Sequence, residues 1–123
     1  MRPGRYDFTV YRGGTLGIGL SARDASDVAI SFDKYTTMRM QVRHAWDKAA
    51  GEPLLELTSA NGGLTVVNAG LGISVNMHAS ETASLAFDEG VYDLELVIEA
   101  EGEEDIVDKM LYGKFYVMSE VTV

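Results

Sequence analysis

The sequence predicts an all-β sandwich of antiparallel strands, because its apolar residues recur at every second position rather than with the period of a helix. The run MRMQVR at residues 38–43 alternates strictly, so one face of this strand is apolar and the other is basic. Residues 61–63 (NGG) and 68–70 (NAG) tolerate positive φ angles and separate neighbouring runs. Short alternating strands separated by such turns are typical of sandwiches and barrels.

The expected strands follow one another along the whole chain, and each is marked by apolar side chains at alternate positions. These positions are Tyr6, Phe8 and Val10; Leu16, Ile18 and Leu20; Met38, Met40 and Val42; Leu55 and Leu57; Leu64 and Val66; Leu71, Ile73, Val75 and Met77; and Tyr92, Leu94, Leu96 and Ile98. With a last strand from about residue 106 to residue 117, about seven to eight strands are expected. Residues 80–85 predict at most one helical turn, with Ser80 as its cap and with Ala83 and Leu85 facing the core.

Length and composition place the chain among single-domain globular proteins. It has 123 residues, of which 46% are hydrophobic and 24% charged, so we expect one domain spanning residues 1–123. The net charge of −9 opposes binding to nucleic acid phosphates, and the lack of cysteine excludes disulfides and thiolate chemistry. No run approaches the roughly 20 apolar residues of a membrane-spanning helix, and no secretory signal follows residues 1–5. These features predict a protein that is made in the cytoplasm and does not bind membranes.

The segment DEGVYDL at residues 88–94 has the spacing of the tyrosine corner found in immunoglobulin-like sandwiches. In such a corner Asp88, Gly90 and Tyr92 carry the chain from one sheet to the other. The buried Tyr92 hydroxyl then bonds to a backbone group that the crossing leaves unpaired. The alternative is that Tyr92 is an inward-facing core residue of its strand. Both interpretations predict an immunoglobulin-like antiparallel β-sandwich.

No set of residues predicts catalysis or a bound cofactor. His44 and His78 are the two histidines, and an exposed strand-end position is a simpler interpretation of each than a catalytic triad or a metal site. The glycines between residues 13 and 19 lack a following Gly-Lys-Ser/Thr sequence, so they are interpreted as strand bends or points of close backbone approach. The acidic residues between 99 and 108 lack the spacing of a calcium loop and predict a solvated hairpin tip. We therefore expect a protein without enzymatic activity, cofactor or metal.

The final strand is apolar on both faces, which suggests a surface that binds another protein. One parity contains Leu111, Phe115 and Val117, and the other contains Met110, Tyr112, Tyr116 and Met118. If the first series packs in the core, the second forms an exposed stripe of residue types that are common at protein interfaces. The alternative is that a loop of the same domain covers the stripe. Trp46 is a further candidate interface residue, with an inward-tucked position as its alternative.

Five segments of the chain, taken in order, resemble a family of small proteins common in phages and prophages. The segments are FTVYRGGTL, MRMQVR, LLELTSANGGLTV, GLGISVNMHASETASLAFDEGVYDLELVI and LYGKFYVMSEVTV, and together they extend over residues 8–122. That family is similar to the immunoglobulin-like N-terminal domain of phage baseplate upper proteins. Before residue 38 the chain departs from the Gly-x-Pro or Leu-Thr-Gly patterns frequent in the family, with ASD at residues 25–27 and FDKY at residues 32–35.

The resemblance implies a non-enzymatic structural or adaptor role in the virion of a tailed phage, at the neck, tail, baseplate or capsid surface. Other virion structural proteins are the implied partners, and a symmetric multi-copy assembly is the implied arrangement. The implied location is the virion, after synthesis in the host cytoplasm, with no nucleic acid or membrane partner. A carbohydrate- or cell-surface-binding immunoglobulin-like module is the alternative, and exposed aromatic side chains on a concave face would favour it.

Overall fold

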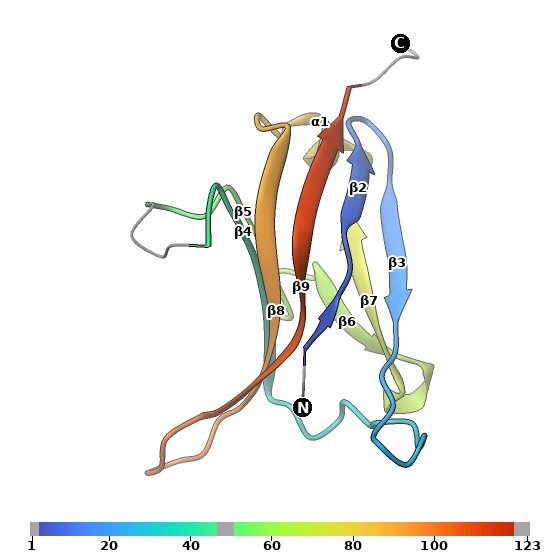
Figure 1. Cartoon of the computed structure of the whole chain (residues 1–123), viewed down its shortest axis with the longest axis vertical. Coiled ribbons are helices and arrows are strands. Elements are labelled where there is room, and N and C mark those ends of the chain that lie inside the picture. Colours follow the sequence, from blue (N-terminus) through green and yellow to red (C-terminus); the bar gives the residue numbers. More distant parts are fainter. Residues whose placement is uncertain (1–2, 47–50, 120–123) are drawn as a thin grey trace.

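The computed structural model describes residues 3–46 and 51–119, and within these ranges nine strands form two sheets that pack face to face (Figure 1). The larger sheet contains β1 (Gly4–Arg5), β2 (Phe8–Tyr11), β4 (Thr37–Arg43), β5 (Leu55–Thr58), β8 (Glu89–Ile98) and β9 (Ile106–Met118). The smaller sheet contains β3 (Leu16–Leu20), β6 (Leu64–Val67) and β7 (Gly72–Met77). The architecture confirms the predicted all-β sandwich.

The strand order is that of an immunoglobulin-like domain. Neighbours in the larger sheet follow the order β1-β9-β8-β4-β5, with β2 also beside β9, and those in the smaller sheet follow β3-β7-β6. The first series contains the G, F, C and C′ strands of a variable-type domain, and the second contains its B, E and D strands. β1 and β2 run parallel to β9, whereas the other described strand pairs are antiparallel. The N-terminal segment therefore belongs to the larger sheet and leaves β3 at the edge of the smaller one.

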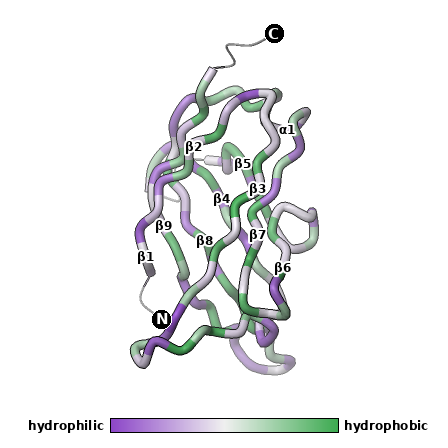
Figure 2. Tube along the Cα trace, turned by 90° about the vertical axis from the view of Figure 1, so that its right-hand side faces the viewer, coloured by the Kyte–Doolittle hydropathy of each residue, from purple (hydrophilic) through white to green (hydrophobic). Residues whose placement is uncertain are grey.

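The core lies between the two sheets and contains most of the predicted inward positions. Figure 2 shows the hydrophobic segments along the strands that enclose it. The largest fully buried side chains are Tyr92, Phe8, Phe32, Phe115, Met40, Leu64, Ile73, Leu94, Leu96, Val10, Val42 and Val75. Three residues that were predicted to face the core from strands are instead exposed: Tyr6 lies in the break between β1 and β2, Leu71 precedes β7, and Val66 lies on the edge strand β6.

The helical content is limited to two short segments of the described chain, α1 (Ala79–Ala83) and the 3-10 turn η2 (Asn68–Gly70). The cap of the helical turn was predicted two residues too late, because the N-cap is His78 rather than Ser80. The Glu81 carboxylate accepts a 2.9 Å hydrogen bond from the His78 backbone N–H, which stabilises the helix start. Thr82 rather than Ala83 is buried. Neither segment is long and apolar enough to cross a bilayer.

A β-bulge in β9 exchanges the inner and outer faces of its side chains. Leu94 of β8 pairs with Leu111, whereas Glu95 pairs with Lys109, so Met110 is an extra residue in the ladder. Met110 is 4% exposed and belongs to the core. The prediction that Met110 lies on the outer stripe is therefore wrong, because regular alternation along a sequence does not reveal an inserted residue.

The N-terminal segment changes course between β1 and β2, where it passes over β9. β1 and β2 pair with β9 on either side of Gly113 and Lys114. A Cβ atom on Gly113 would lie 2.2 Å from the Tyr6 carbonyl oxygen, so glycine is required for this close approach. The Asp7 carboxylate accepts a 2.9 Å hydrogen bond from the Lys114 backbone N–H at the break. We call Tyr6, Asp7, Gly113 and Lys114 the N-terminal seam.

Tyr92 contributes to this seam from the core. It is 1% exposed, and its hydroxyl donates a 2.5 Å hydrogen bond to the carbonyl oxygen of Tyr6. That partner lies in the seam and not in the crossing before β8, so the predicted tyrosine corner is wrong and Tyr92 is an inward-facing core residue. Of the other two residues of the predicted corner, Asp88 is exposed and Gly90 is buried. Gly90 packs so closely that a Cβ there would lie 2.7 Å from Val42 Cγ1.

Arg12, in the turn between β2 and β3, holds the crossing before β8. Its guanidinium donates hydrogen bonds to the carbonyl oxygens of Leu85 at 3.0 Å and Phe87 at 2.8 Å. It also pairs with the Asp88 carboxylate at 2.9 Å. The Thr82 hydroxyl bonds to two backbone groups of the same turn. Arginine thus supplies the backbone hydrogen bonds at this crossing that a corner tyrosine was predicted to supply.

Candidate functional site

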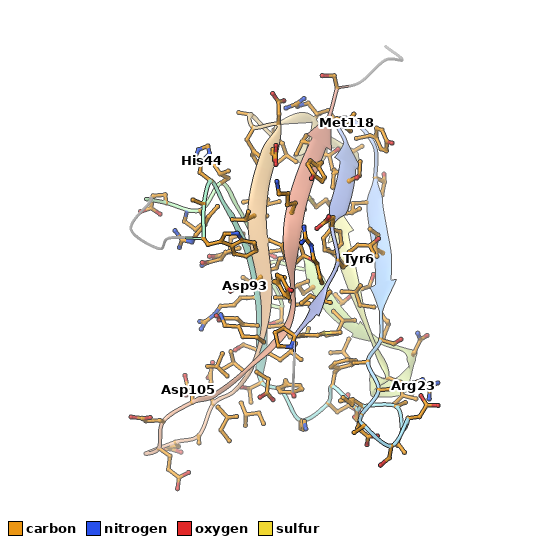
Figure 3. All side chains as sticks on the ribbon, viewed as in Figure 1. Tyr6, Arg23, His44, Asp93, Asp105 and Met118 are labelled. Carbon is orange, nitrogen blue, oxygen red and sulfur yellow. The ribbon has the colours of Figure 1, made fainter. Side chains whose placement is uncertain are left out.

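The outer face of β4, β8 and β9 carries a network of paired charges (Figure 3, in which Asp93 is labelled). The Arg39 Nε lies 2.5 Å from Glu95 Oε2, and the Lys109 Nζ lies 2.9 Å from Asp93 Oδ2. Lys109 also bonds to the second oxygen of Glu95. The basic outer face predicted for residues 38–43 is therefore balanced by carboxylates of β8.

Glu95 is the central charge of this network and is 9% exposed. Burial opposes its ionisation, but hydrogen bonds from Lys109 and Arg39 outweigh that effect and hold the pKa of Glu95 below its usual value. The carboxylate is therefore ionised at neutral pH and fixes the two basic side chains on either side of it. A partner that binds here meets charges that are already paired, which limits the cost of desolvating them.

Polar side chains extend the face toward β5. Gln41 donates a 2.6 Å hydrogen bond to Glu56, and Arg43 donates a 3.1 Å hydrogen bond to the side-chain oxygen of Gln41. A second nitrogen of Arg43 bonds to the carbonyl oxygen of Gly51, after the end of β4. The direction of these side chains is thus set by neighbours, which makes the face more rigid than separate surface side chains would be.

Trp46 and Tyr112 form an aromatic pair beside the charge network. Their ring centroids are 6.1 Å apart with an interplanar angle of 65°, an edge-to-face arrangement. Trp46 is 59% exposed and follows β4, whereas Tyr112 is 39% exposed and lies on β9. Next to Trp46 is a recess of about 140 Å³. Its lining includes Trp46, Arg39, Gln41, Arg43, Asp93 and Glu95.

The structure brings together four of the five predicted interface residues on or beside one face. Tyr112, Tyr116 and Met118 lie at alternate positions of β9 after the bulge, and Trp46 contacts the first of them. Tyr112 and Met118 are exposed and Tyr116 is half-buried, whereas Met110 is in the core. The sequence-based prediction missed Tyr11, which is 62% exposed and pairs with Met118. Tyr11 follows the core residue Val10 in an alternating strand, and this pattern could have predicted that Tyr11 faces outward.

The residues weighed for catalysis and metal binding do not form a site in the described part of the chain. His44 and His78 are exposed, and Glu101, Glu103 and Glu104 are exposed at the tip between β8 and β9. Among the described residues, no group of three or more histidine or acidic side chains is placed to hold a metal ion. The face of β4, β8 and β9, together with Trp46, is therefore the strongest candidate site, and we call it the outer face.

Comparison with known proteins assigns no family to the chain: no family model matches it, and no curated protein matches it significantly. The strand order defines the immunoglobulin-like fold, but that fold supports many unrelated functions. A function must therefore be inferred from the chemistry of the outer face together with the resemblance in the sequence.

Proposed function

We propose that this protein is a non-enzymatic structural or adaptor component of a tailed-phage virion, located at the neck, tail, baseplate or capsid surface. It binds other virion proteins through the outer face and occurs in the particle in multiple copies. The observation that carries the proposal is the row of Tyr112, Tyr116 and Met118 along the outer side of β9, with Trp46 packed against Tyr112. Three of these four large side chains are substantially exposed. The resemblance to phage proteins supplies the class of partner.

The outer face has the composition expected of a specific protein interface. Tyrosine, tryptophan, methionine and arginine are enriched in interfaces, and recesses beside aromatic residues accept side chains of the partner. Here the recess next to Trp46 lies beside the paired charges of Arg39 and Glu95. An apolar partner side chain in the recess would provide affinity, while the polar surroundings would fix its orientation.

A symmetric particle lowers the affinity that each contact must provide. A ring or capsid repeats the same contact many times, so an interface of about 1,200–2,000 Å² in total is sufficient for specificity. The chain has a total accessible surface of 7502 Å², so one sheet face can supply its share of such an interface.

The proposal is tested by replacing Tyr112 and Tyr116 with aspartate in a phage genome. We expect the Tyr112→Asp/Tyr116→Asp protein to fold but to be lost from purified virions, because each contact would bury two unpaired charges. The matched control is Thr65→Asp/Ala69→Asp, which adds the same charge at exposed positions of the smaller-sheet side. Mass spectrometry of virions measures incorporation, and thermal melting of the purified variants measures folding.

Two outcomes of this experiment would contradict different parts of the proposal. If the wild-type protein is missing from purified virions, the structural role is wrong. If the double variant is incorporated as well as the control, the role stands but the outer face is not the contact surface. Reconstruction of the particle then identifies the surface that is used.

A glycan-binding module is the second candidate function, and the recess favours it. Sugars stack on aromatic rings and hydrogen-bond to planar polar groups, and here Trp46 lies beside Arg43 and Asp93. In that case the isolated domain would bind a glycan saturably, and Trp46→Ala would abolish binding without changing the melting temperature. Titration against a panel of bacterial surface glycans separates the two functions, because an adaptor gives no saturable binding.

A further inference from the structure

The edge of β3 is open within the described residues. β3 pairs with β7 on one side only, because β1 and β2 join β9 instead of covering β3. An immunoglobulin domain of the constant type places its first strand at this position. The uncovered edge offers backbone hydrogen-bonding groups to another strand.

The register shows which backbone groups point outward. The Asn76 N–H donates to the Gly63 carbonyl oxygen, on the β6 side of β7. Because backbone direction alternates along an antiparallel strand, Val75 and Met77 direct their groups toward β3. Their partners there are Ile18 and Leu16. Gly17 and Gly19 alternate with these residues along β3. Their backbone N–H and C=O groups therefore point away from β7, toward the open edge.

The exposed edge carries none of the features that usually prevent strands from pairing. Residues 13–22 contain no charged side chain and no proline, although the whole chain has a net charge of −9. Gly17 and Gly19 are exposed, and a Cβ on either would have no atom within 4 Å. By contrast, the edge strand β5 carries Glu56. β3 is thus neutral and accessible.

We infer that β3 pairs with β3 of a second copy of this chain, antiparallel and about a two-fold axis at Ile18. This register places Gly17 opposite Gly19 of the other copy. The outward groups of these glycines then form two pairs, each of which exchanges two backbone hydrogen bonds. The result is one continuous sheet, β6-β7-β3 joined to its symmetry mate.

The same register covers apolar surface that the single chain leaves partly exposed. Leu16 is buried at 8% exposure, but Ile18 and Leu20, which share its inward parity, are only half-buried. Across the axis Ile18 meets its own mate, and Leu20 meets Leu16 of the other copy. These contacts extend the core from one sandwich into the next and explain why the partner is a copy of the same strand.

This pairing uses the smaller sheet and is independent of the proposed function, which uses the outer face of the larger sheet. The two proposals therefore fail separately. Loss of self-association would leave virion incorporation through the outer face to be judged by its own test. The dimer is likewise compatible with glycan binding, because the recess beside Trp46 lies on the larger sheet.

The test is the oligomeric state of charge variants of the whole chain. Gly17→Glu/Gly19→Glu and Gly17→Lys/Gly19→Lys each place like charges opposite one another across the axis, whereas Gly17→Glu/Gly19→Lys places opposite charges there. Analytical ultracentrifugation should show a wild-type dimer, a dissociation constant raised about tenfold or more in both like-charge variants, and a dimer in the mixed variant. Mixing the two like-charge variants should give a heterodimer. Far-UV circular dichroism and melting confirm that each variant is folded.

The three variants distinguish repulsion between residues that face each other across the axis from repulsion due to the net charge of the chain. If net charge alone controlled association, the lysine variant would associate more strongly than the wild type, because it reduces the negative charge of the chain. A wild-type protein that stays monomeric at millimolar concentration would overturn the inference. So would a like-charge variant that is folded and dimerises as well as the mixed variant. Protection of the Gly17 and Gly19 amides from hydrogen exchange should rise with protein concentration, and unchanged protection would also count against the pairing.

Discussion

The edges of β9 and β3 lie on the same side of the sandwich, yet the described part of the chain covers only the first (Figure 1). β9 is covered by β1 and β2 through the N-terminal seam, in which backbone and side-chain groups are paired. β3 is left with outward backbone groups and half-buried apolar residues. The difference shows that the placement of one short segment decides which edge of a two-sheet domain is closed and which is available to another chain.

Glycine has opposite roles at the two edges. Gly113 in β9 is required because the Tyr6 carbonyl occupies the space of a side chain. Gly17 and Gly19 in β3 have open space around them, so of the two predicted roles, a strand bend or a close backbone approach, the second is wrong at these residues. Gly13, with a φ of 82°, does occupy a turn that favours glycine. Substitutions at the two edges should therefore have very different effects.

Gly113→Ala should give the largest effect, because it pushes β1 away from β9. We expect a loss of about 3 kcal/mol in the free energy of unfolding, as for other overpacked sites. Gly17→Ala is the matched control and should be neutral or stabilise by up to about 1 kcal/mol, since a strand interior favours alanine over glycine. Chemical denaturation of both variants measures the difference. Equal midpoints for the two would show that the N-terminal seam does not cover β9 in solution.

The strands were predictable because one face of each packs into the core. Side-chain alternation located β4, β7 and β8 because each extends over several residues with one inward face. The break between β1 and β2 was not predictable, because it depends on contact between Tyr6 and Gly113, which are distant in the sequence. The bulge at Met110 was hidden for the same reason, since it is defined by pairing with β8.

The sequence predicted which kinds of residue form the candidate site, but it did not predict how they are arranged. Tyr112 and Met118 were placed correctly because parity after the bulge is regular. The recess was not predictable, because it forms where Trp46, after the end of β4, lies near Asp93 of β8. The ionic partner of Arg39, Glu95, was hidden too, since the pair depends on the register of β4 and β8.

Tyr92→Phe should weaken the covered edge by a smaller amount than Gly113→Ala. The change leaves the Tyr6 carbonyl without its hydroxyl donor while the ring still fills the core, so we expect a loss of about 1–3 kcal/mol in the free energy of unfolding. Urea denaturation measures this loss. Tyr35→Phe is a control, since it removes a hydroxyl that bonds to Asp108 at 2.7 Å, away from the seam.

The two tyrosine variants differ in what they should do to the N-terminal segment. Tyr92→Phe should increase hydrogen exchange at the Tyr6 amide, which donates to the Tyr112 carbonyl oxygen, whereas Tyr35→Phe should not. An unchanged denaturation midpoint in Tyr92→Phe, with unchanged exchange at Tyr6, would mean that this hydrogen bond does not stabilise the covered edge.

The smallest expected effect is a pH dependence at Asp7. The hydrogen bond from the Lys114 backbone N–H, aided by the nearby charge of Arg5, holds the pKa of Asp7 below its ordinary value of 3.8. The folded protein therefore binds this proton more weakly than the unfolded chain does. The contribution of Asp7 to stability is fully present above pH 3.8 and is lost as the pH falls through the lower folded-state pKa.

An NMR titration of the Asp7 carboxyl carbon measures that pKa, and we expect a midpoint below 3.8. Asp7→Asn keeps an oxygen acceptor for Lys114 but cannot titrate, so the protection of the Lys114 amide from hydrogen exchange, relative to its intrinsic rate at each pH, should not depend on pH. Asp7→Ala removes the acceptor and should speed that exchange. Because the seam is what closes the edge of β9, a midpoint at or above 3.8, together with unchanged exchange in Asp7→Ala, would mean that backbone pairing alone holds β1 and β2 in place.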